Sequence, residues 1–123
     1  MRMIDRRSRK PSLLACIGGL LAAASIGLAA YAAHGVADPS AQSRLQTAAL
    51  YAFGHGVALA ALGRKADRLL ETLALSLLLV GTLLFSGSLL GGALWGWSTR
   101  FAPAGGIAMM AGWVLFAFNA MRR

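Results

Sequence analysis

Four long stretches without a charged residue are the feature that most constrains this chain. A helix needs about 20 apolar residues to cross the hydrocarbon core of a bilayer. The stretches predict transmembrane helices over residues 13–33, 45–63, 72–95 and 101–121. The hydrophobic content of 58% agrees, because a soluble domain of 123 residues would leave much of that surface in water. We therefore predict an all-α, polytopic membrane protein in which residues 1–123 form a single domain.

The positive charges predict the orientation of these helices. Of the 12 Lys and Arg residues, all except Arg44 and Arg100 precede the first span, join the second span to the third, or follow the fourth. Cytoplasmic segments retain Lys and Arg during insertion, so we expect both termini in the cytoplasm. Short connections favour an antiparallel four-helix bundle. A cleaved signal peptide is an alternative for the first span, but that span exceeds the 7–15 apolar residues typical of such signals.

Several function classes are disfavoured by what the spans contain. The formal net charge of +8 comes from cations at the ends of apolar runs, which is not the pattern of a nucleic-acid-binding surface. The single cysteine, Cys16, excludes an internal disulfide, and we expect its side chain to pack among the helices. No Asp or Glu lies inside a span, which disfavours proton-coupled antiport. His34 and His55 lie at different depths and lack acidic or thiol partners, so we predict no haem, metal or other cofactor and no catalytic residue.

Polar residues recur on one face of the second span. Thr47, Tyr51 and His55 are four residues apart, and His55 would lie near the middle of the bilayer. Ionisable groups at that depth usually face the interior of a bundle. We therefore predict a candidate polar intramembrane cluster of His34, Gln46, Tyr51, His55, Ser86 and Ser88. A neutral His55 that only fixes helix packing through a hydrogen bond is the alternative.

Glycines form a second pattern. Small residues let helix backbones approach closely in lipid, where the hydrophobic effect between helices is weak. Pairs four residues apart occur near the end of the third span, and more glycines open the fourth. The residues we predict for helix packing are Gly87, Gly91, Gly92, Gly96, Gly105 and Gly106. The contacts would lie within the bundle or between copies of the chain.

Four ordered motifs give the chain a family resemblance. They are the segment LAAYAAHG ending at Gly35, LQTA followed by Tyr51 and His55, LFSGSL around Gly87, and PAGG followed by Gly112 and Trp113. In this order and spacing they resemble the domain of unknown function 423 family, small bacterial inner-membrane proteins related to an uncharacterised eukaryotic transmembrane protein. The resemblance covers nearly all of the chain from Leu13 onwards. It implies a four-helix fold in the bacterial inner membrane and no established activity.

The chain departs from the family pattern at five positions, three of which are aromatic or polar in the pattern. It has Ala30 and Ala32 in place of glycines, Gly54 in place of an aromatic residue, Leu90 in place of a tyrosine and Ala102 in place of a threonine. A polar site shared by relatives would therefore lose part of its lining here.

These observations predict an uncharacterised, non-enzymatic structural or accessory component of the membrane. Its expected partners are the lipid bilayer and either further copies of the chain or a larger membrane complex. The alternative is a small-solute channel or transporter that uses the polar cluster in the outer half of the bundle. An enzyme acting on lipid or quinone has the least support, because no general base is evidently paired with a nucleophile.

Overall fold

Four long α-helices make up the fold. The computed structural model describes residues 11–122. Its elements are α2 (Leu13–Gly35), α3 (Pro39–Leu62), the short 3₁₀ turn η1 (Gly63–Lys65), α4 (Leu69–Trp95) and α5 (Ala102–Met121). Each of the four α-helices is long and apolar enough to cross a membrane, and the described residues contain no strand. The predicted all-α fold with four helices able to span a membrane is confirmed.

Capping residues set the helix ends. The side chain of Asp38 accepts a hydrogen bond from the backbone N–H of Ala41 at 2.9 Å, and Pro39 occupies the first turn of α3. This helix therefore begins six residues before the predicted span 45–63. At the C-terminal end of α4, Gly96 adopts the left-handed conformation with φ of 71°, which stops the helix after Trp95. The charge-free stretches thus mark the apolar part of each helix, and the caps mark its ends.

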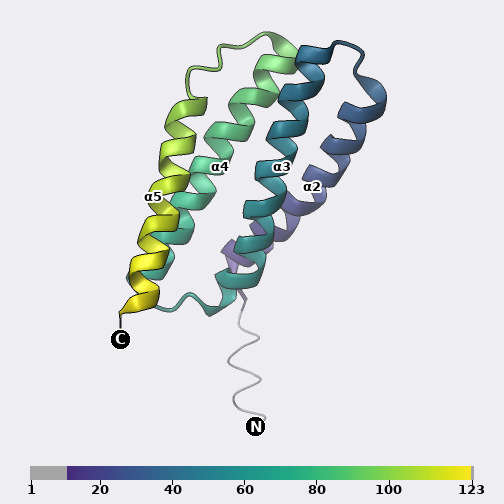
Figure 1. The fold of residues 1–123 in the computed structure, drawn as a ribbon. Coiled ribbons are helices and arrows are strands. Elements are labelled where there is room, and N and C mark those ends of the chain that lie inside the picture. Colours follow the sequence, from purple (N-terminus) through teal and green to yellow (C-terminus); the bar gives the residue numbers. More distant parts are fainter. Residues whose placement is uncertain (1–10, 123) are drawn as a thin grey trace.

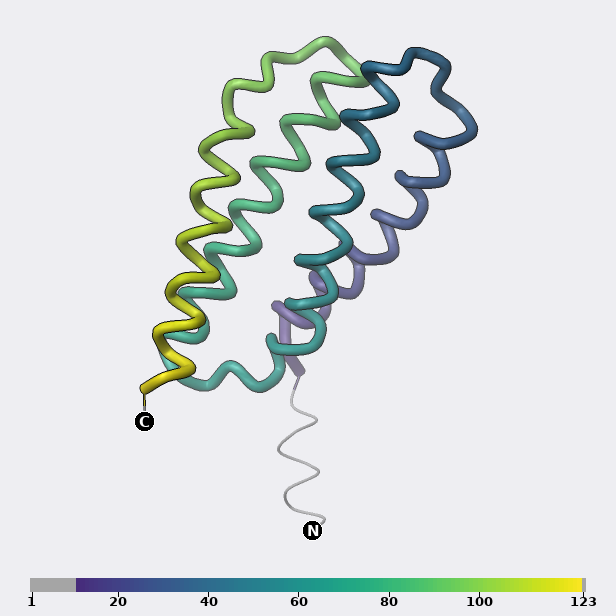
Figure 2. Tube along the Cα trace, viewed as in Figure 1, coloured from purple at the N-terminus to yellow at the C-terminus, as the bar shows by residue number. Residues whose placement is uncertain are grey.

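Each helix packs mainly on its neighbour in the chain: α2 on α3, α3 on α4, and α4 on α5. Figure 1 shows α2 and α5 at opposite edges of the molecule, with α3 and α4 between them. In the trace of Figure 2 the chain turns back at each connection, so the start of α2 and the end of α5 lie at the same end. The two outer helices consequently leave much of their surface uncovered.

Glycines face each other at two helix contacts. A Cβ added to Gly18 of α2 would lie 2.6 Å from the carbonyl oxygen of Gly56 of α3, and one added to Gly56 would lie 2.8 Å from the oxygen of Gly18. Gly81 of α4 and Gly105 of α5 repeat this arrangement, at 2.7 and 2.6 Å. Any side chain at these positions would force the backbones apart, so glycine is what permits both contacts.

A small apolar core joins α3 and α4 where α2 begins. Leu59, Leu75 and Leu78 are almost completely buried there, and Leu14 and Leu21 of α2 pack against them. Most other large apolar side chains point outwards; Val114, for example, is 69% exposed. Such a surface is costly in water and ordinary in lipid.

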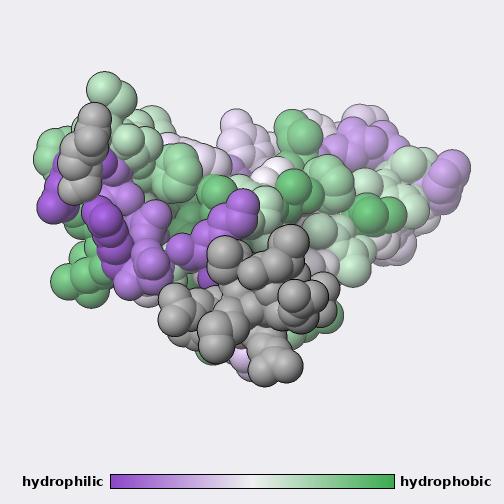
Figure 3. Space-filling model, turned by 90° about the horizontal axis from the view of Figure 1, so that it is seen from below, coloured by the Kyte–Doolittle hydropathy of each residue, from purple (hydrophilic) through white to green (hydrophobic). Residues whose placement is uncertain are grey.

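The end of the molecule at which α2 begins is more polar than the flanks. Figure 3 shows this end, with hydrophilic side chains gathered on part of it and hydrophobic side chains around them. The connection between α3 and α4 lies here and carries the exposed residues Arg64, Lys65 and Arg68. Cys16, expected among the packed helices, is instead exposed on α2, because α2 is covered mainly by α3.

Candidate functional site

His55 is the centre of the polar interactions between helices. It is 9% exposed, and its Nδ1 lies 2.8 Å from the backbone carbonyl oxygen of Tyr51, one turn earlier on α3. Its Nε2 lies 2.9 Å from the indole Nε1 of Trp113 on α5. A carbonyl oxygen only accepts and an indole N–H only donates, so Nδ1 carries the hydrogen and Nε2 the lone pair. The arrangement therefore requires the neutral imidazole, because a second proton would set two donors against each other.

Aromatic rings surround this histidine. The ring of Tyr51 is stacked with the imidazole at a centroid distance of 6.2 Å and meets the ring of Phe85 at 4.7 Å. The ring of Trp113 is 5.8 Å from the imidazole. Together they line a groove of about 340 Å³, with Gly106, Met109 and Met110 as its other walls. Residues of α3, α4 and α5 meet here: His55 connects α3 to α5, and Tyr51 connects α3 to α4 through Phe85.

The other four residues of the predicted cluster lie at separate places. Ser86 donates a hydrogen bond to the backbone carbonyl oxygen of Ala48 at 2.8 Å and so ties α4 to α3. Ser88 lines a different groove, near the connection that follows α4. His34 is exposed in the last turn of α2. The structure therefore brings Tyr51 and His55 together and leaves His34, Gln46, Ser86 and Ser88 outside their groove.

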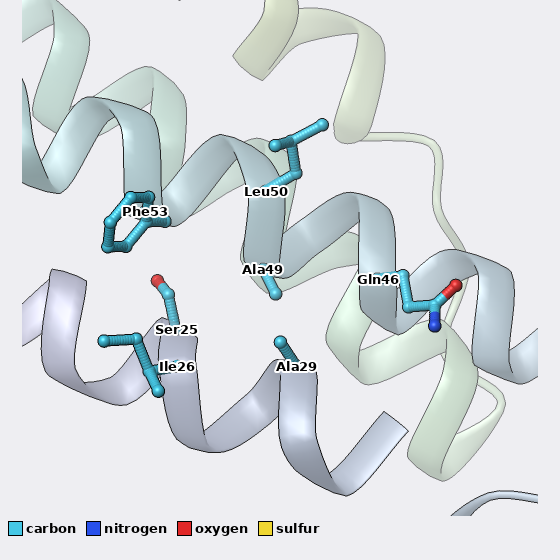
Figure 4. A pocket seen from close by; sticks show the side chains of 7 residues that line it. All are labelled: Ser25, Ile26, Ala29, Gln46, Ala49, Leu50 and Phe53. Carbon is cyan, nitrogen blue, oxygen red and sulfur yellow. The ribbon is translucent and has the colours of Figure 1, made fainter. Parts of the chain in front are cut away.

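Gln46 lines a groove of about 370 Å³ between α2 and α3. In Figure 4, Ser25, Ile26 and Ala29 of α2 lie opposite Ala49 and Phe53 of α3, with Gln46 at one end. This groove is mostly apolar. Its serine is occupied within its own helix, since Ser25 Oγ donates to the carbonyl oxygen of Leu21 at 2.6 Å.

Two polar residues between helices were not part of the predicted site. Trp113 supplies the donor to His55, and Gln42 donates from Nε2 to the backbone carbonyl oxygen of Ala32 at 2.8 Å, joining α3 to α2. Trp113 stands in one of the motifs that carry the family resemblance, and that was its only signal in the sequence. Gln42 lies before the apolar stretch of the second span, where a polar residue is unremarkable.

The six glycines predicted for packing play different parts. Gly105 lies directly against the backbone of Phe85. Gly91 lies beneath the ring of Trp97, and Gly92 lies against Thr99, so these two contact the connection after α4 rather than a helix. Gly96 ends α4, while a Cβ added to Gly87 or Gly106 would have no atom within 4 Å. The remaining close contacts with helices are made by glycines outside the prediction: Gly18, Gly56, Gly63, Gly81 and Gly112.

The fold defines a protein of four helices able to cross a membrane, with its interhelical polar contacts concentrated on α3. Residues 28–106 match the family described as Protein of unknown function (DUF423), and the match begins in the first of the four motifs and ends in the last. Because it covers more than half of the chain, the chain belongs to this family, as its motifs predicted. No curated protein and no solved structure shows significant similarity.

Proposed function

We propose that this chain is a non-enzymatic accessory or structural protein of the bacterial inner membrane. Its four helices cross the bilayer as an antiparallel bundle, and both termini are cytoplasmic. The length and apolar character of the helices support the crossing. The concentration of Lys and Arg at one end of the predicted spans supports the orientation, since only Arg44 and Arg100 belong to the other end.

The observation that carries the proposal is the use of polar groups between the helices. His55 has both ring nitrogens hydrogen-bonded within the protein, and the hydroxyl of Ser86 is bonded to α3. A general base needs a free lone pair directed at its substrate. The lone pair on Nε2 of His55 instead accepts from Trp113. These groups therefore fix helices to one another, which is the expected arrangement for a scaffold.

The uncovered flanks support an accessory role. Large side chains on α2 and α3 face outwards, among them Leu20 at 67% exposure, Ile26 at 62% and Leu50 at 68%. Lipid covers such a surface, and so does another membrane helix. An accessory protein offers this kind of face to its partner while its own helices stay packed.

Purification of the full chain in mild detergent tests the role. We expect a tagged chain, expressed at its natural level and cross-linked before extraction, to run as a homo-oligomer or in one defined complex. An unrelated four-helix membrane protein with the same tag is the control. A strictly monomeric chain with no partner above that control would contradict the accessory role.

A channel or transporter is the alternative, and it would need a continuous polar path. The six residues predicted for that path are distributed over separate places, which supports the scaffold instead. We expect liposomes containing the purified chain to release small solutes no faster than protein-free liposomes. Solute flux that a His55→Ala variant abolishes would favour transport.

A further inference from the structure

A groove with a charged mouth lies where α4 meets the connection to α5. Its volume is about 460 Å³. The lining residues are Leu83, Leu84, Gly87 and Ser88 of α4, together with Trp97, Ser98, Arg100 and Phe101. The residues from the connection are polar, charged or aromatic, and those deeper along α4 are mainly apolar. We call it the Arg100 groove.

Among residues 11–122, no acidic side chain forms an ion pair with the cation at its mouth. The guanidinium of Arg100 lies 5.3 Å from the centre of the Phe101 ring, a contact that holds it beside the groove. Of the described acidic residues, Asp38 caps α3, and Asp67 and Glu71 belong to the opposite end of the helices. The guanidinium is therefore free to pair with an anion from outside the chain. Its planar, forked set of N–H donors suits the oxygens of a phosphate.

Hydroxyl groups beside Arg100 add hydrogen-bonding capacity. Ser98 Oγ accepts from the backbone N–H of Arg100 at 3.3 Å, which leaves its own hydrogen free to donate. Ser88 Oγ is buried and has no hydrogen-bond partner among residues 11–122. Because Ser88 Oγ is covered by protein atoms, the donors open to a ligand are the Arg100 guanidinium and the Ser98 hydroxyl, which match the oxygens of a phosphate.

The apolar part of the groove lies within the depth of one lipid leaflet from the end of α4. Leu83 lies twelve residues before the end of α4 at Trp95, or about 18 Å along a helix that rises about 1.5 Å per residue. The hydrocarbon core of a bilayer is about 30 Å thick, so one leaflet accounts for roughly half of that. Gly87, one turn from Leu83, has no atom within 4 Å of where its Cβ would be, which leaves room for a chain. Trp95 and Trp97 stack at 5.1 Å beside the mouth, and tryptophans are enriched at the membrane interface.

We propose that the Arg100 groove binds one anionic phospholipid of the outer leaflet. The phosphate pairs with Arg100 and accepts from Ser98, and one acyl chain lies along Leu83, Leu84 and Gly87. This inference rests on the membrane insertion and orientation proposed above. It goes beyond the scaffold role, because it assigns a ligand to a site that helix packing does not use.

Native mass spectrometry of the purified full-length chain tests this binding. Phosphatidylglycerol and phosphatidylcholine with identical acyl chains are added at equal concentrations, and the fraction of protein retaining one lipid is measured. We expect the anionic lipid to be retained preferentially. Arg100→Gln should reduce that preference about fivefold, the effect of one cation close to an anionic headgroup. Arg44→Gln, at the other cation of this end, does not line the groove and should reduce the preference less than Arg100→Gln does.

A second pair of variants tests the apolar part. Gly87→Leu should fill the groove without disturbing a helix contact and reduce retention of both lipids. Gly27→Leu is the matched control, because Gly27 also has an open Cβ position and lies eight residues before the end of its helix, as Gly87 does. Equal retention of the two lipids by the wild-type chain, or no loss in Arg100→Gln, would overturn the proposal.

Two further outcomes separate the sources of the anion. If inorganic phosphate displaces the lipid at millimolar concentration, or if Gly87→Leu has no effect, the groove binds a headgroup anion alone and the lipid proposal is wrong. Carbonate extraction of membranes from the same cells reports on insertion independently. A chain that carbonate releases refutes the membrane role itself, whereas an inserted chain without lipid preference refutes only the groove.

Discussion

At the scale of single residues, the bond between Trp113 and His55 joins helices that are not neighbours in the chain. Its donor stands on α5 and its acceptor on α3, 58 residues apart. The hydrogen bond from His55 Nδ1 to the carbonyl oxygen of Tyr51 fixes the ring so that Nε2 faces the indole. The imidazole therefore acts as a rigid acceptor, and its orientation is determined within α3.

Trp113→Phe tests this bond, since phenylalanine keeps an aromatic ring and loses the donor. We expect the free energy of unfolding in detergent to fall by about 0.6 to 1.7 kcal/mol, the average and upper values measured for hydrogen bonds between membrane helices. Equilibrium unfolding followed by circular dichroism measures the change. Trp95→Phe, at an exposed ring outside these contacts, is the control and should change stability less. Equal losses in both variants would show that the bond adds nothing beyond ring packing.

Part of this arrangement could be predicted from the sequence. Tyr51 and His55 are four residues apart on a helix, so their proximity follows from helical geometry alone. The partnership with Trp113 could not be predicted, because it depends on how α5 packs on α4 and faces α3. His34 failed to join the cluster for a similar reason: in the last turn of α2 it is Ala32 that meets α3, and His34 is exposed.

At the scale of helices, the sequence correctly predicted that glycines allow close helix contacts. Most of these contacts, however, are made by glycines other than the predicted ones. The pairs four residues apart near the end of α4 suggested a packing face, but the backbones of α4 and α5 meet at Gly81 and Gly105. Spacing shows which glycines share a face. It does not show which face meets a neighbour, because that depends on the helix rotation fixed by larger side chains such as Leu78 and Met109.

Adjacent residues on α5 provide a matched test of this contact. Gly105→Ala would place a Cβ 2.6 Å from the carbonyl oxygen of Gly81, so we expect it to lower the free energy of unfolding by about 1 to 3 kcal/mol. Gly106→Ala meets open space and should raise that free energy by up to about 1 kcal/mol, through the better helix propensity of alanine. Denaturation in detergent measures both. If the two variants have the same stability, the close approach of α4 and α5 is not what requires glycine.

At the scale of the whole molecule, orientation is the property that the charges predict and labelling can test. In a Cys16→Ala background, Ser40→Cys places a thiol in the first turn of α3, beside the connection from α2, and Asp67→Cys places one in the connection between α3 and α4. Both positions are exposed. We expect a membrane-impermeant maleimide to label Ser40→Cys in intact cells and Asp67→Cys only after permeabilisation. The reverse pattern would place both termini in the periplasm.

The packing of each helix on its predecessor has a consequence for biosynthesis. Because α3 meets α2 and α5 meets α4, the packing within each pair of helices can form as soon as the second helix of the pair has been inserted. The indole of Trp113 arrives last, with α5, so its bond to His55 can form only after the three earlier helices are in place. Loss of that bond should therefore leave insertion intact and act on the finished assembly alone.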